Sequence, residues 1–212
     1  MIDNTGQIPR VELAHFQALY NYDNDVTHEG LKLHPKLQVK DVYPDNFWVQ
    51  RVSGATRLFS QTSAKGLKKM EELGLITGTT ATQKMAIFFN EVFDLFNTSS
   101  SDKCPSRQPI KLDEQQRLAR LEEIRQHLLC WKSTVPQQSR LSNITINHWN
   151  VSLQSLISSI KFLFEEGWSF VQTKRFNQDN LEVNWSSSFV HEFISFSLIL
   201  LLLREPFLNN IF

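Results

Sequence analysis

The sequence predicts a mainly α-helical chain, and two observations lead to that prediction. Apolar residues recur at helical spacing through several long segments. Glycine or proline marks the ends of most of these segments, as expected at helix termini. There is no internal repeat, heptad seam or glycine-rich phosphate loop to suggest another architecture. At 212 residues, the chain is long enough to form one or two domains with a sizeable core.

The first part of the chain is expected to contain one short helix followed by irregular backbone. Pro9 and the apolar residues up to Tyr20 predict an amphipathic helix. The polar residues 21–30 are typical of a loop. Pro35 disfavours a helix over residues 31–37, which we therefore expect to be irregular or extended.

Longer helices are expected in the remainder of the chain, over residues 45–73, 81–96, 113–131 and 146–164. Gly74 and Gly167 stand where glycines cap helix ends. The polar residues 98–109 are expected to form a mobile linker, and a short segment, residues 168–173, follows the last helix.

Composition and motif content exclude several classes of function. Lys plus Arg number 22 and so do Asp plus Glu, so no global basic field indicates nucleic-acid binding. Cys104 and Cys130 lack a CxxC spacing, and no HxxxH pair occurs, so neither a zinc site nor a disulfide framework is indicated. The sequence also lacks GxSxG and GxxxxGK[ST] motifs.

The two ends of the chain indicate an intracellular protein. The N-terminus has neither the basic nor the apolar region of a signal peptide, so we expect the protein not to be secreted. The apolar run at residues 193–203 falls short of the roughly 20 residues needed to span a bilayer, so we expect no membrane segment.

Two pairs of polar residues at i, i+3 spacing are the candidates for chemistry. Asp94 and Asn97 stand on the polar side of an aromatic helix beside Phe93. A carboxylate can accept from guanine N1–H and N2–H2, and a phenylalanine ring can stack on a base. Asp179 and Glu182 could bind a divalent metal and orient a polar ligand. Both pairs also fit ordinary helix termini, at which such residues are common.

Five segments, in order along the chain, resemble P-element-type transposases, including the animal THAP-domain transposases. The segment RFNQDNLE (175–182) is similar to the family's QDxLE segment. Before it come GLKLHPKLQVKDVYPDN, WVQRVSGATRLFSQTSAKGL, ATQKMAIFFNEVFDLFNTSS and ITINHWNVSLQSLISSIKFLF. The resemblance begins near Gly6 and ends at Glu182. The chain departs from the family pattern at several positions: Asp41 replaces a His, Arg51 and Ser53 each replace a Lys, Gly54 replaces a Leu and Arg57 replaces a Gln.

The resemblance implies a domain organisation and a set of site residues. Residues 1–20 would be a remnant of the upstream RNase H-like half, residues 21–173 a helical GTP-binding insertion domain, residues 174–185 the start of the C-terminal RNase H-like half, and residues 186–212 an unrelated apolar tail. Glu182 would be a catalytic residue and a magnesium ligand. The implied GTP-binding residues are Lys36, Arg51, Val52, Phe93, Asp94, Asn97 and Asp179.

The resemblance therefore implies a fragment of a P-element-like transposase. Two of the family's three catalytic carboxylates and its zinc-binding THAP domain have no counterpart in the sequence. We therefore expect GTP binding without autonomous strand transfer, with Mg²⁺ acting only in a complete family member. DNA binding is expected to be weak, the location nuclear, and oligomers possible through the family's assembly. The alternative is a non-enzymatic helical interaction module, such as a domesticated remnant or a pseudogene product.

Overall fold

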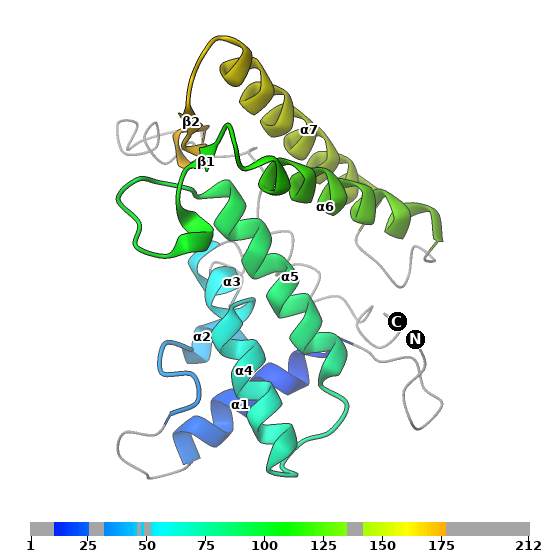
Figure 1. The fold of residues 1–212 in the computed structure, drawn as a ribbon. Coiled ribbons are helices and arrows are strands. Elements are labelled where there is room, and N and C mark those ends of the chain that lie inside the picture. The colour runs from blue at the N-terminus through cyan, green and yellow to red at the C-terminus, as the bar shows by residue number, and fades with distance from the viewer. Residues whose placement is uncertain (1–10, 26–31, 46–47, 49–51, 135–141, 177–212) are drawn as a thin grey trace. The chain divides into compact units, whose positions relative to one another are not determined.

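The computed structural model describes residues 11–25, 32–45, 48, 52–134 and 142–176 (Figure 1). Most of these residues are in helices, and the described residues also form one two-stranded sheet. This composition confirms the predicted mainly α fold. The chain divides into two compact units, and the boundary falls inside a helix, between Asn90 and Glu91. Within the part of the chain that the structure describes, no helix combines the length and apolarity needed to cross a membrane.

The first unit is built from helices around an aromatic core. Its elements are α1 (Leu13–Asp25), α2 (Val39–Val42), α3 (Val52–Leu58), α4 (Gln61–Glu72) and the first turns of α5 (Thr80–Phe96). The ring of Phe59 packs edge-on against Phe16 at 5.8 Å and lies 5.4 Å from the ring of Phe89. Gly66 of α4 allows close packing against α1, because a Cβ there would lie 3.0 Å from a methyl group of Leu19.

Helix α1 is longer than the sequence suggested, because it continues to Asp25 through residues expected to form a loop. Asp23 explains this extension. Its carboxylate is buried and accepts hydrogen bonds from the backbone N–H groups of Leu33 and His34, at 2.8 and 2.7 Å. The sequence alone assigns Asp23 to a loop. In the structure its carboxylate supplies the hydrogen-bond acceptor that the backbone N–H groups of the non-helical segment need. Residues 32–38 are indeed non-helical, as expected for the described part of this segment.

The single helix expected over residues 45–73 is wrong, because the structure has two helices with a break at Phe59 and Ser60. Ser60 adopts an extended conformation, and its hydroxyl accepts a hydrogen bond from Ser63 N at 3.1 Å, so that it caps α4. Gly74 has a φ of +70°, which confirms the predicted glycine cap at the end of α4.

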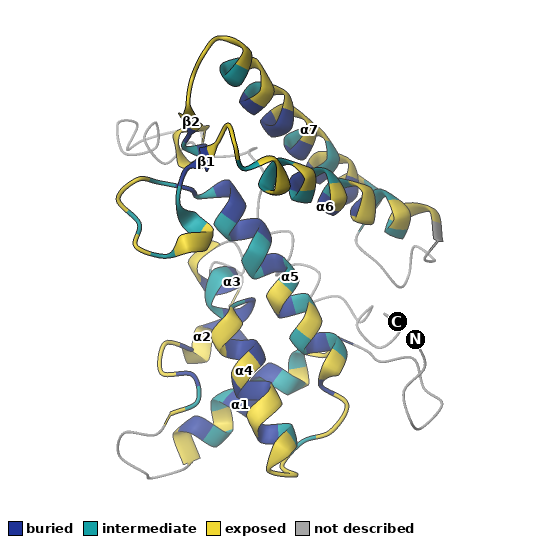
Figure 2. Cartoon of the chain, in the orientation of Figure 1, coloured by how far each residue is buried: buried dark blue, intermediate teal, exposed yellow. Residues whose placement is uncertain are grey.

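The second unit consists of two long antiparallel helices and a small sheet. Its elements are the last turns of α5, the 3-10 helix η2 (Pro105–Arg107), β1 (Ile110–Lys111), α6 (Gln115–Thr134), α7 (Asn143–Glu165), β2 (Phe170–Val171) and the 3-10 helix η4 (Thr173–Phe176). Figure 2 shows buried residues along α6 and α7, whose core side chains include Leu121, Ile124, Leu128, Leu153, Ile157 and Ile160. The strands β1 and β2 pair antiparallel, which the sequence had not indicated.

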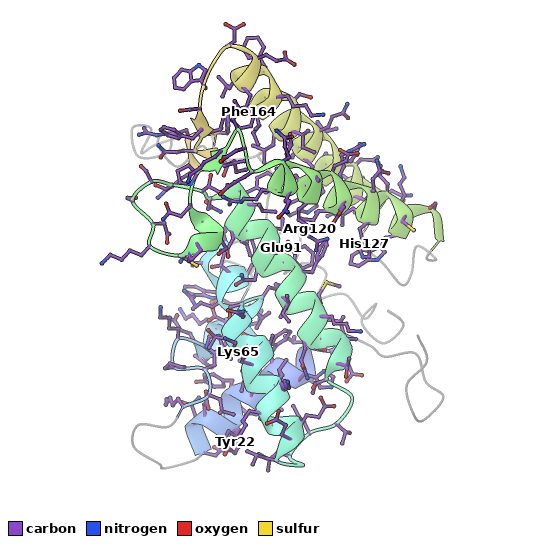
Figure 3. All side chains as sticks on the ribbon, viewed as in Figure 1. Tyr22, Lys65, Glu91, Arg120, His127 and Phe164 are labelled. Atoms are coloured by element: carbon purple, nitrogen blue, oxygen red, sulfur yellow. The ribbon has the colours of Figure 1, made fainter. Side chains whose placement is uncertain are left out.

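Polar contacts fix the end of α5 within the second unit. The guanidinium of Arg120 on α6 donates to both carboxylate oxygens of Glu91, at 2.7 and 2.8 Å, and Figure 3 shows the two side chains. Thr98 and Thr173 are both buried and bond to each other through backbone and hydroxyl groups. These contacts join segments far apart in sequence, and they hold the C-terminal part of α5 at Glu91 and just beyond its end at Thr98.

A buried ion pair joins α2 to α3 in the first unit. The side chain of Asp41 is fully buried, and Arg57 donates to both of its oxygens, Nε to Oδ2 at 2.7 Å and Nη2 to Oδ1 at 2.8 Å. Trp48 Nε1 and the backbone N–H of Gln38 donate to the same carboxylate, at 3.0 and 2.9 Å. A buried carboxylate with four donors is well compensated for its loss of hydration.

Replacing Asp41 by alanine is expected to destabilise the protein by about 2–3 kcal/mol. The value lies below the roughly 3–5 kcal/mol typical of broken buried pairs, because the Arg57 side chain is 21% exposed and can regain water. Urea unfolding measures the change. The matched control is Glu72→Ala, which breaks an exposed pair with Lys69 and is expected to cost about 0.5 kcal/mol or less. An Asp41→Ala protein as stable as the control variant would contradict the structural role of Asp41.

Candidate functional site

Asp94 lies in the last turn of α5, in the second unit. The Ser106 hydroxyl donates to Asp94 Oδ2 at 2.6 Å, and Arg107 Nε lies 3.8 Å from Oδ1. A helix C-terminus carries partial negative charge and therefore disfavours a carboxylate, which these two partners offset. The Asp94 side chain is 17% exposed, so this charged group remains at the protein surface.

The two other predicted guanine-site residues of this helix, Asn97 and Phe93, are close to Asp94 in the chain. The side-chain amide of Asn97 donates to the Phe93 carbonyl at 2.8 Å, as in an ordinary helix C-terminus. Phe93 is only 6% exposed, which leaves little ring surface on which a base could stack. Of the three residues, Asp94 therefore has the side chain best placed to meet a ligand.

Two predicted nucleotide-binding residues lie in the first unit. Lys36 is exposed in the turn that precedes α2, and Val52 is the exposed first residue of α3. The turn itself is held by His34, whose Nε2 lies 3.1 Å from the Ser60 hydroxyl and 3.2 Å from the Arg57 carbonyl. Lys36 is thus presented by an ordered turn, and its role in nucleotide binding stays a prediction.

Three of the departures from the family pattern lie together in the first unit. Asp41 and Arg57 form the buried ion pair, and a Cβ on Gly54 would lie 3.2 Å from both Asp41 Oδ1 and Trp48 Nε1. The three positions are therefore linked, because the carboxylate pairs with the guanidinium and the glycine leaves space beside the carboxylate. The Arg57 guanidinium is accordingly engaged by Asp41.

The remaining predicted site residues lie outside the described residues. They are Arg51, Asp179 and Glu182, and the predicted apolar tail at residues 186–212 is outside as well. The domain boundaries implied by the resemblance also stay predictions. Among the residues that the structure does describe, no group of three or more His, Cys, Asp or Glu side chains is placed to hold a metal ion.

Sequence reasoning missed Ser106 and Arg107, which the structure places against Asp94. Both belong to residues 98–109, which were expected to be a mobile linker. Instead, Arg117 of α6 donates to the backbone carbonyls of Ser106 and Gln108, each at 2.7 Å. Ser99 N donates to the Arg107 carbonyl at 2.8 Å. A sequence can signal such contacts only weakly, because they depend on one arginine in a neighbouring helix.

Comparison with known proteins indicates a fold relationship. Searches of protein-family models and of curated proteins find no match. Among solved structures, the chain is similar to a chain of the Drosophila P element transposase strand transfer complex, with a TM-score of 0.59 and 24% sequence identity. The match covers 80% of this chain and 38% of the transposase chain. The described helices therefore have the fold of a helical part of that transposase, and the chain spans well under half of its length.

Burial of histidines makes the stability of the protein depend on pH. Burial lowers the pKa of His34 below its ordinary value of 6.5, and Nδ1 of His34 is buried without a hydrogen-bond partner. Burial likewise lowers the pKa of His15 and of His127. The unfolded chain binds protons as the pH falls through 6.5, whereas the folded chain resists doing so. The stability that these neutral histidines confer is therefore present above pH 6.5 and is lost below it.

We expect His34→Gln to reduce the loss of stability between pH 7.5 and pH 5.5, since glutamine has no proton to gain in this range. His15 and His127 remain, so the reduction is partial. Urea unfolding at the two pH values measures the loss in each variant. Exposed His148→Gln is the control and should keep the wild-type pH dependence. A His34→Gln protein with an unchanged pH dependence would contradict the account.

Proposed function

We propose that the chain is a fragment of a P-element-type transposase that binds a guanine nucleotide through Asp94. The main support is the position of Asp94, a partly exposed carboxylate at the end of a helix, held from a neighbouring segment. The similarity of fold to the P element transposase supports the same proposal. The roles of Lys36, Arg51, Val52 and Asp179 in the nucleotide site rest on the resemblance in sequence.

The selectivity of the proposed site follows from hydrogen-bond chemistry. A carboxylate has only acceptors, and guanine presents N1–H and N2–H2 side by side as donors. Adenine has no donor at N1 and no amino group at C2. The Asp94 carboxylate would therefore face the N1 acceptor of adenine and could not form a hydrogen bond with it. Hydrogen bonds to a charged group contribute about 1.5–3 kcal/mol each, which is enough for clear preference. GTP should therefore bind more tightly than ATP.

Replacing Asp94 by alanine is expected to weaken GTP binding roughly ten- to hundredfold and to leave ATP binding unchanged, since one charge-assisted contact is lost. Calorimetric titration with both nucleotides measures the preference. Asp113→Ala is the matched control, because Asp113 is an exposed carboxylate before α6. Equal affinities for GTP and ATP in the unmodified protein would rule out guanine recognition.

We propose further that the chain does not cut or join DNA by itself. A two-metal site requires several carboxylates around ions about 3.5–4 Å apart, and the resemblance supplies only Glu182 as a metal ligand. Because Lys and Arg do not outnumber Asp and Glu, DNA binding is expected to be weak and to fall steeply with salt. By the same resemblance the protein would act in the nucleus.

Incubating the purified chain with supercoiled plasmid and magnesium or manganese, with and without GTP, tests this part of the proposal. The expected result is no nicking and no joining under any of these conditions. Metal-dependent nicking that disappears in a Glu182→Gln variant would contradict it, because the chain would then hold a complete metal site.

One observation favours the alternative of a helical interaction module. On α7, three apolar side chains are more than half exposed and recur at spacings of 7 and 11 residues, which places them on one face of the helix: Ile144, Val151 and Phe162. Such a face suits a helical protein partner. If the chain serves only this purpose, the nucleotide titration will show no preference for guanine.

A further inference from the structure

The segment that touches Asp94 is held firmly in the second unit. We call residues 99–108, between α5 and β1, the strap. Arg117 fixes the strap by donating to the carbonyls of Ser106 and Gln108, and Ser99 N closes the strap onto the Arg107 carbonyl. The side-chain amide of Gln108 also donates to the Asp102 carbonyl. The backbone around Ser106 and Arg107 is thus fixed independently of Asp94.

The side chains of the strap meet the carboxylate of Asp94. The Ser106 hydroxyl has one hydrogen, and its 2.6 Å contact with Asp94 Oδ2 uses it, because a carboxylate only accepts. Cys104 Sγ lies 3.1 Å from the same hydroxyl oxygen and is then the donor to it. On the other side, Arg107 Nε lies between two carboxylates, 3.8 Å from Asp94 Oδ1 and 3.3 Å from Asp102 Oδ2.

This arrangement conflicts with two-point recognition of guanine. The base would offer one donor to each carboxylate oxygen, yet Oδ2 already accepts a short hydrogen bond. An oxygen can accept twice, but with only 17% of the Asp94 side chain exposed there is little room for a second donor beside the serine. When only a fraction of the protein molecules is in the state that can bind, the apparent affinity for the ligand falls by that fraction.

We propose that Ser106 competes with guanine for Asp94, so that the strap lowers the affinity of the site. The inference rests on the proposed guanine-nucleotide function and adds its regulation. Nucleotide binding requires the Ser106 hydroxyl to leave Oδ2. The contact is a single hydrogen bond to a charged group, so its removal has a measurable effect.

The test is calorimetric titration of GTP into the full chain and three variants. Ser106→Ala removes the competing donor and is expected to bind GTP about five- to tenfold more tightly than the unmodified protein. Ser106→Thr keeps a hydroxyl and should retain the original affinity. Ser101→Ala, the matched control, removes a strap hydroxyl that contacts Ser99 and should change nothing.

The outcomes separate the strap from the proposed function. Equal or weaker GTP binding by Ser106→Ala would overturn the competition and make Ser106 a residue that positions Asp94. If Ser101→Ala also binds GTP more tightly, the competition is overturned, because the effect would then come from the strap as a whole and not from the Ser106 hydroxyl. If neither the unmodified chain nor Ser106→Ala binds GTP, the guanine-nucleotide function fails, and the competition fails with it.

Discussion

The buried ion pair between Asp41 and Arg57 is the constraint on which the described part of the first unit most depends. A carboxylate without solvent exposure must be paired, and here one side chain gathers donors from α2, α3 and the segment between them. A glycine at position 54 suits this arrangement, because a Cβ there would make tight contacts of 3.2 Å with the Asp41 carboxylate and the Trp48 indole nitrogen.

Asp94, the proposed guanine-binding residue, contrasts with Asp41 in its burial. Asp41 is fully buried and saturated with donors, so it has no capacity for a ligand. Asp94 is partly exposed and stands where the helix disfavours its charge, and its partners include the Ser106 hydroxyl and the more distant Arg107 guanidinium. A carboxylate that remains partly exposed can still meet a ligand, as the proposed guanine site requires.

Sequence reasoning predicted the elements whose stability is local. The helices α5, α6 and α7 have apolar residues at helical spacing, and each lies close to its predicted position. The features that were missed depend on tertiary contacts. The extension of α1 depends on Asp23 bonding to a distant backbone, and the order of residues 98–109 depends on Arg117. The role of Asp94 in a guanine site stays a prediction, and the sequence carried no signal for the serine that contacts it.

Guanine recognition by Asp94 is the central claim, and a change of base preference tests it most directly. Xanthine has a carbonyl oxygen where guanine has its 2-amino group, so an asparagine at position 94 can donate to it while accepting from N1–H. The affinities of the unmodified protein and Asp94→Asn for GTP and xanthosine triphosphate should be compared by titration. The account predicts that the unmodified protein prefers GTP and that Asp94→Asn prefers xanthosine triphosphate. An Asp94→Asn protein that keeps the original preference would contradict the account.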